Sequence, residues 1–141
     1  MKEISFKDKQ PFTEDILFEI AKLENCGSGH IKKWHRDMDK NFIYNGIIKY
    51  ELYNENDVDS KLIEIMKEVG IEYKLNGENS IIFNKTNFFW DFELIHSKWT
   101  GKYKLIYSKE NKKGEYAGLV EKEFTKPETV VRNIKKMLNI N

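Results

Sequence analysis

The chain has 141 residues, a length that suits one compact domain. Its 24 lysines and arginines nearly balance 23 aspartates and glutamates, so the formal net charge of +1 gives no electrostatic reason to expect nucleic acid as a partner. With 40% hydrophobic and 13% aromatic residues the chain can bury a core, which excludes a protein that is disordered by composition.

Several features of the sequence predict a cytoplasmic location. No apolar run is long enough to cross a bilayer, and residues 1–5 lack the apolar stretch of a signal peptide. The single cysteine, Cys26, cannot form an internal disulfide, which is typical of a reducing compartment. Lysine, isoleucine and asparagine are frequent and alanine is rare, a bias that indicates an AT-rich bacterial or phage genome. We therefore expect a cytoplasmic bacterial protein without a membrane segment.

Three segments have the apolar spacing of amphipathic helices. The first spans about residues 14–25 and ends before Gly27, the second lies between Asp57 and Gly70, and the third begins at the capping sequence Thr125–Glu128. Their predicted buried stripes are Phe12, Ile16, Ile20 and Leu23 in the first helix, Val58, Leu62, Ile65 and Val69 in the second, and Val130, Ile134, Met137 and Leu138 in the third.

The segments between these helices have the composition and alternation of antiparallel strands. Asn45-Gly46 and Asn76-Gly77 are typical turn dipeptides, because both residues tolerate a positive φ. A third hairpin is predicted with Thr100-Gly101 as a two-residue turn, which pairs His96 with Leu105. This register puts the apolar residues of both arms on one face and the charged residues on the other.

A last strand is predicted over about residues 115–124, so the expected element order is α-β-β-α-β-β-β-β-β-α. Strands that follow one another through hairpins favour an antiparallel sheet, here of about five to seven strands, with helices packed against it. No linker or internal repeat interrupts the chain. The sequence therefore predicts a single α+β domain over residues 1–141.

The most unusual segment runs from Cys26 to Asp37. Its start, Cys26-Gly27-Ser28, resembles the Cys-Gly-Ser of papain-like proteases, but Cys26 follows a helix where those enzymes place the cysteine at a helix start, so we expect a raised thiol pKa. The segment also suggests a small metal-independent ribonuclease, with histidines as acid and base and cations holding the phosphate. The alternative is a polar loop. The candidate catalytic residues are His30, Lys33, His35 and Arg36.

Neither a metal site nor a cofactor site is predicted. His30 and His35 are five residues apart and no cysteine pair accompanies them, so the sequence lacks a zinc-binding pattern. Asp57-Val58-Asp59 lacks the glycine and the terminal glutamate of a calcium loop. His96 falls on the apolar face of its predicted strand, so we expect it to be a hydrogen-bonded core histidine.

The aromatic run at residues 88–92 predicts a protein-binding surface. Strand alternation turns Phe89 to the face opposite the core, together with Ile95 and Trp99. Aromatic side chains inside a charged rim are typical of protein interfaces. The alternative is that a loop or the first helix buries this face. The candidate surface consists of Phe89, Asp91, Glu93, Ile95, Trp99, Lys102 and Lys104.

These features favour a protein that functions through a surface. Because no cofactor loop, metal set or catalytic triad is found, the expected function is that of a bacterial immunity or antitoxin-type inhibitor, which binds a cognate toxin or enzyme and blocks it. Two alternatives stay open: the ribonuclease described above, and a phage or mobile-element accessory protein that blocks a host machine.

Overall fold

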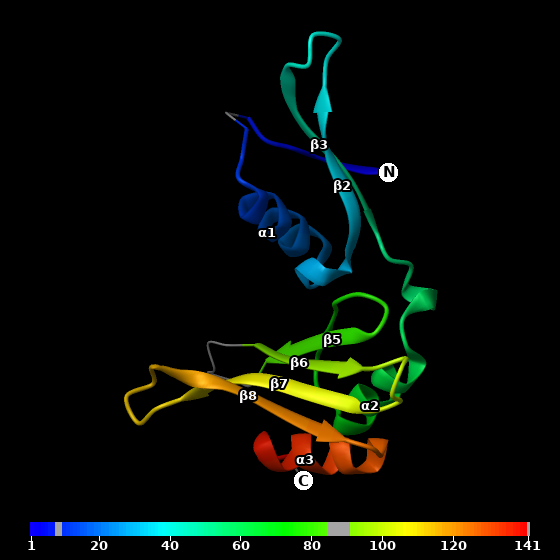
Figure 1. The fold of residues 1–141 in the computed structure, drawn as a ribbon, viewed down its shortest axis with the longest axis vertical. Helices are drawn as coiled ribbons and strands as arrows, with labels where there is room; N and C mark the ends of the chain where they lie inside the picture. The colour runs from blue at the N-terminus through cyan, green and yellow to red at the C-terminus, as the bar shows by residue number, and fades with distance from the viewer. Residues whose placement is uncertain (8–9, 85–90, 141) are drawn as a thin grey trace.

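The computed structural model describes residues 1–7, 10–84 and 91–140, and this part of the chain forms three α-helices and eight strands in two antiparallel sheets (Figure 1). The predicted α+β class is confirmed. The helices are α1 (Thr13–Glu24), α2 (Ser60–Val69) and α3 (Pro127–Met137). The strands are β1 (Lys2–Ser5), β2 (Ile31–Met38), β3 (Tyr44–Leu52), β4 (Lys74–Leu75), β5 (Ser80–Asn84), β6 (Asp91–His96), β7 (Tyr103–Glu110) and β8 (Tyr116–Phe124).

The predicted element order is confirmed from α1 to α3, but the structure adds the strand β1, which the sequence did not predict. This strand pairs with β3, far along the chain, in a register that places Ile4 beside Ile48. Only Ile4 among its four residues is even half-buried, so the segment has no apolar alternation of its own. Pairing with a distant strand, rather than a local pattern, makes β1 a strand. No helix in the described part of the chain is long and apolar enough to span a bilayer.

The N-terminal half of the molecule consists of a three-stranded sheet, with strand order β1-β3-β2, and the helix α1 beside it (Figure 1). Its core joins two α1 side chains, Ile16 and Ile20, to Ile48 and Tyr50 of β3. The predicted apolar stripe of α1 is therefore correct only at its centre. Its two ends are wrong, because Phe12 is 77% exposed and Leu23 is 60% exposed.

The C-terminal half contains the five-stranded sheet, with strand order β4-β5-β6-β7-β8, and α2 and α3 pack on one of its faces. The periodicity predicted for α2 is confirmed, since its apolar residues are buried against the sheet. The helix begins later than predicted, because Asp59 rather than Asp57 caps it and accepts a 2.9 Å hydrogen bond from the Lys61 amide. The predicted capping box of α3 is not formed, because Lys126 occupies the N-cap position without a side-chain bond.

Two of the three predicted turns need correction. Asn45-Gly46 lies inside β3, and the chain turns earlier, at residues 39–43. Asn76-Gly77 does lie in the β4–β5 turn, as predicted. The β6–β7 hairpin pairs His96 with Tyr103 instead of Leu105, because its loop has four residues rather than two. This shift of two positions preserves strand alternation, so the predicted division into an apolar and a charged face is confirmed.

The two halves meet where residues 27–30 contact the β4–β5 turn. The Gly29 amide donates a 2.8 Å hydrogen bond to Asn76 Oδ1, and the Gly77 amide donates a 3.1 Å hydrogen bond to His30 Nδ1. A Cβ at Gly27 would lie 2.2 Å from Asn76 Oδ1, and one at Gly29 would lie 2.7 Å from it. The two glycines are therefore required for this close approach. Gly27 does not end α1 as predicted, since Asn25 adopts the left-handed conformation there.

Candidate functional site

The turn between β6 and β7 presents Trp99 to solvent on an ordered backbone. The Ser97 hydroxyl accepts hydrogen bonds from the Trp99 and Thr100 amides, both at 3.3 Å. The Gly101 amide donates a 2.9 Å bond to the Ser97 carbonyl, and Gly101 has a φ of +71°, which favours glycine. Trp99 itself is 97% exposed. The turn therefore holds a large aromatic side chain almost entirely in water.

A shallow hollow of about 500 Å³ lies beside this turn. Four of the seven predicted surface residues line it: Ile95, Trp99, Lys102 and Lys104. Ile95 is half-buried and lies directly opposite Lys104 in the β6–β7 ladder, on the sheet face away from α2 and α3. The structure thus brings the aromatic, aliphatic and cationic members of the predicted surface together.

Two further predicted residues lie on the same sheet face, closer to the start of β6. Glu93 is engaged within the chain, because its Oε2 accepts hydrogen bonds from Asn76 Nδ2 at 2.7 Å and from the Ser80 hydroxyl at 2.9 Å. Asp91 is exposed and accepts a 2.9 Å bond from Asn84. Glu93 therefore orders the β4–β5 turn, and Asp91 is the more exposed of the two carboxylates. The remaining predicted residue, Phe89, lies outside the described residues.

The charges nearest to Trp99 are predominantly positive. Lys98 lies 3.8 Å from Glu78 in an exposed ion pair. Lys102 and Lys104 form no ion pair with any residue that the structure describes, and Glu123 is the acidic residue that lines the hollow with them. Lys98 and Glu123 are not among the residues that the sequence predicted for this surface. The lysine lies within the turn itself, and the glutamate reaches the hollow only through β7–β8 pairing.

His96 fixes this turn to the second helix. Its Nδ1 lies 2.6 Å from Asp59 Oδ2, and its Nε2 lies 3.2 Å from the Gly101 carbonyl oxygen. The imidazole also stacks on the Tyr103 ring at a centroid distance of 4.2 Å. The predicted hydrogen bonding of His96 is confirmed, but its predicted place in the core is wrong, because the residue is only half-buried and lines the hollow beside the turn. The contacts of this side chain connect the N-terminus of α2 to the backbone that carries Trp99.

The residues of the predicted ribonuclease site are not brought together. His30 is 3% exposed, and its Nδ1 is occupied by the Gly77 amide. Lys33 and His35 lie on one exposed face of β2, while Arg36 Nη2 donates a 2.6 Å hydrogen bond to the Pro11 carbonyl. The alternative of a polar loop is wrong for residues 31–38, because they pair with β3 as a strand. A general acid, a general base and a phosphate-holding cation must converge on one substrate. These four side chains do not meet that condition.

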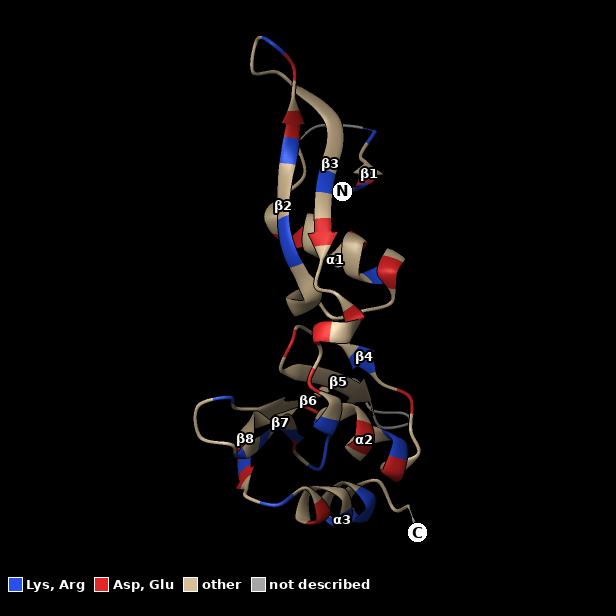
Figure 2. Cartoon of the chain, turned by 90° about the vertical axis from the view of Figure 1, so that its right-hand side faces the viewer, with Lys and Arg blue, Asp and Glu red and all other residues tan. Residues whose placement is uncertain are grey.

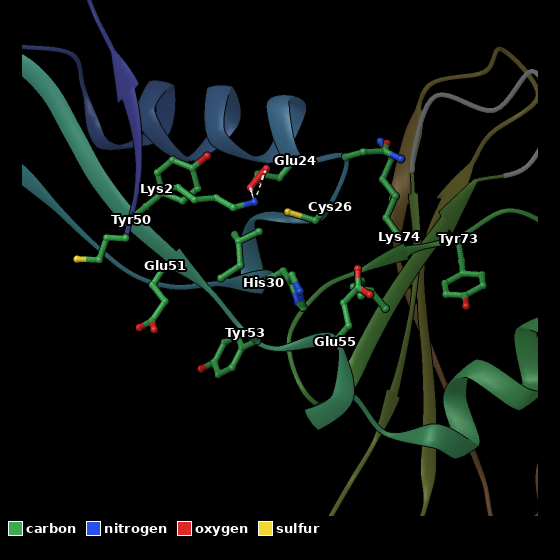
Figure 3. A pocket seen from close by; sticks show the side chains of 14 residues that line it. Lys2, Glu24, Cys26, His30, Tyr50, Glu51, Tyr53, Glu55, Tyr73 and Lys74 are labelled. Carbon is green, nitrogen blue, oxygen red and sulfur yellow. Dashed lines mark hydrogen bonds and ion pairs between the residues drawn. The ribbon is translucent and has the colours of Figure 1, made fainter.

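A cleft of about 710 Å³ at the junction of the two halves contains Cys26 and His30 (Figure 3). Burial, reinforced by the nearby Glu24 carboxylate, raises the pKa of the Cys26 thiol, and burial lowers the pKa of the His30 imidazole. The predicted direction for Cys26 is thus confirmed, although its main cause is burial. A cysteine nucleophile requires a thiolate, and these shifts favour a neutral thiol beside a neutral imidazole.

Among the described residues, no group of three or more histidine, cysteine, aspartate or glutamate side chains is arranged to hold a metal ion. The Lys2–Glu24 ion pair at 2.6 Å spans one wall of the junction cleft, so these two charges neutralise each other there. The turn that carries Trp99, by contrast, combines an exposed aromatic side chain with a backbone held by hydrogen bonds. The chain matches no protein-family model, and no curated protein and no solved structure matches it.

Proposed function

We propose that this chain is a protein-binding module that acts as an inhibitor of the immunity or antitoxin type and covers the active site of a cognate toxin or other enzyme. The observation that carries the proposal is Trp99, which is 97% exposed on a turn that hydrogen bonds hold in place. Tryptophan is among the residues that contribute most to binding when they are buried at an interface.

The order of the turn supports a role in binding. Side chains and loops that become fixed only in the complex reduce affinity through their lost freedom. Here the Ser97 hydroxyl, the Gly101 amide and the His96 imidazole already fix the backbone on both sides of Trp99. The aromatic ring can therefore enter a partner at a smaller entropic cost than one on an unrestrained loop.

The charges around Trp99 indicate the chemistry of the partner. Lys98, Lys102 and Lys104 surround the hollow beside the ring, and Glu123 is its acidic member. Charge complementarity between two proteins accelerates association and selects the partner more than it adds affinity. We infer a partner surface that combines an apolar recess for Trp99 with acidic residues around it.

The test begins with the tagged full chain as bait in a lysate of its host, and the stoichiometric partner is then purified. Substitution Trp99→Ala is expected to weaken that complex by about thirtyfold or more, as for a central interface residue. The matched control is Leu119→Ala, since Leu119 is also exposed, at 59%, but lies on β8. Isothermal titration calorimetry gives both dissociation constants. Equal affinity for the wild type and the Trp99 variant contradicts the binding surface.

Inhibition needs a separate measurement. The captured partner is assayed for its own enzymatic activity with increasing amounts of the full chain, and activity is expected to disappear at a one-to-one ratio. The Trp99→Ala variant should require a proportionally higher concentration. A complex that forms without loss of enzymatic activity would refute the inhibitor while leaving the binding module intact.

A further inference from the structure

The turn between β2 and β3 places a bulky aromatic residue in a backbone conformation that favours glycine. The Phe42 amide donates a 3.0 Å hydrogen bond to the Asp39 carbonyl, and the Asp39 amide donates one of 3.0 Å to the Ile43 carbonyl. This pattern is a three-residue loop followed by a bulge, in which the last loop residue is left-handed and is usually glycine. Phe42 occupies that position with a φ of +62°.

The left-handed conformation is unfavourable for Phe42, because its Cβ comes close to the following carbonyl oxygen. Burial of the side chain would offset this cost, but Phe42 is 85% exposed and the adjacent Ile43 is 60% exposed. Both side chains lie at the edge of a hollow that Phe6 also lines, but most of their surface remains in water, so the fold gains little packing from either. Residues that adopt an unfavourable backbone conformation without stabilising the fold are concentrated at functional sites.

The surrounding contacts hold the loop in this conformation. Asp39 Oδ1 accepts hydrogen bonds from the Asn41 amide at 2.8 Å and from the Ile43 amide at 2.9 Å. Asp37 Oδ2 accepts a 2.9 Å bond from Asn45 Nδ2 just below the turn. Both apolar side chains are thus presented from a loop that is already ordered. The hairpin extends beyond α1 and β1 at one end of the molecule (Figures 1 and 2).

We propose that the tip of the β2–β3 hairpin is a second binding element, in which Phe42 and Ile43 insert together into an apolar recess of a protein partner. The inference rests on the proposed function only in requiring that a protein partner exists. A projecting loop fits a concave surface, and the recess of an enzyme active site has that shape. Residues 37–43 carry Asp37, Asp39 and Lys40, and Asp37 lies 3.8 Å from Lys49. This tip therefore lacks the cluster of cations that attracts a protein to an anionic lipid surface, which favours a protein recess as its partner.

The first test measures conformational strain in the isolated full chain and needs no partner. Asparagine tolerates the left-handed conformation far better than phenylalanine. Substitution Phe42→Asn is therefore expected to raise the ratio of folded to unfolded protein at a fixed urea concentration about fivefold. The matched control is Ile43→Asn, which makes the same change of polarity at a neighbouring exposed position and is expected to leave that ratio unchanged. A ratio that falls or stays constant for Phe42→Asn would overturn the proposal.

The second test measures binding to the partner protein captured by the wild-type chain. Phe42→Asn is expected to weaken this complex at least tenfold although it stabilises the fold, while Phe18→Ser on α1, which replaces another exposed apolar residue, leaves it unchanged. If Trp99→Ala weakens the complex and Phe42→Asn does not, the hairpin proposal fails and the protein-binding function stands. If neither substitution weakens the complex, both the hairpin proposal and the proposed binding surface around Trp99 fail. A third outcome is that the wild-type chain cosediments with phosphatidylglycerol vesicles and the Phe42→Asn variant does not. This result would identify a membrane as the partner of the hairpin tip and would also overturn the proposal.

Discussion

The two halves of the molecule differ in how their apolar side chains are used. In the C-terminal half, α2 and α3 cover one sheet face. Among the residues that the structure describes, the core of this half contains thirteen buried side chains, whereas the core of the N-terminal half contains four. Large apolar side chains of the N-terminal half remain in water instead, among them Phe12, Phe18, Leu23, Phe42 and Ile43. From this difference we expect the C-terminal half to be stable by itself and the N-terminal half to depend on the junction between them.

The two proposed binding elements follow this division. Trp99 is fixed to the larger core through His96 and Asp59, so its position is as stable as that half. Phe42 is carried by a hairpin of the smaller half, and local hydrogen bonds to Asp39 keep its turn ordered. A partner that contacts both elements would stabilise the N-terminal half by binding only its folded form.

The largest expected effect comes from removing core side chains in each half. Leu105→Ala and Ile48→Ala each delete a fully buried side chain and should each cost about 2–5 kcal/mol. We expect Leu105→Ala to destabilise the whole chain, but Ile48→Ala to unfold the N-terminal half first. Urea denaturation combined with hydrogen exchange distinguishes the two. If Ile48→Ala reduces the amide protection of β6 and β7 as much as that of β2 and β3, the larger half is not independently stable.

An intermediate effect is expected at the junction. In Gly29→Ala the new Cβ would meet the Asn76 carbonyl oxygen at 2.9 Å and Asn76 Oδ1 at 2.7 Å, so the backbone of the β4–β5 turn must move. A destabilisation of about 1–3 kcal/mol is expected, as for overpacking at a close contact. Ser28→Ala is the matched control, because Ser28 is exposed and adjacent. A urea midpoint for Gly29→Ala that equals the midpoint of this control would show that the junction tolerates a side chain.

Sequence periodicity predicted the helices and strands that bury only one of their faces. Leu62, Ile65 and Val69 repeat at helical spacing, and their burial against the large sheet confirms α2. Alternation in β6 and β7 predicted the outward face with Ile95 and Lys104. The stripe of α1 was wrong at its ends, because the small N-terminal sheet covers only its centre.

Features that depend on distant contacts or on local strain could not be predicted. Neither the pairing of β1 with β3 nor the contact of His96 with Asp59 has a signal in neighbouring residues. Asn45-Gly46 has the usual turn preference and therefore predicts the β2–β3 turn at the wrong place, whereas Phe42, which occupies the left-handed position, lacks that preference. For the candidate surface, composition and alternation predicted the residues around Trp99. The hydrogen bonds of Ser97 and Gly101 that order the turn could not be predicted from the sequence and are seen only in the structure.

The smallest expected effect is a dependence of stability on pH at the junction. Burial lowers the pKa of His30 below its ordinary value of 6.5, so the unfolded chain binds a proton more readily than the folded chain. The neutral imidazole therefore contributes its full stability above the unfolded pKa of 6.5. This contribution is lost as the pH falls from 6.5 through the lower pKa of the folded chain. Protonation of Nδ1 would also remove the acceptor for the Gly77 amide.

His30→Gln isolates this contribution, because glutamine does not titrate while His35 and His96 remain in the variant. The wild type is expected to show a lower urea midpoint at about pH 5.5 than at about pH 7.5, and the variant a smaller difference between the two. The variant should also be less stable at the higher pH, since glutamine cannot reproduce the acceptor geometry of the imidazole at Gly77. If both proteins lose stability equally over this range, the pH dependence arises outside the junction, and His30 contributes to the contact between the halves only through its packing and its hydrogen bond.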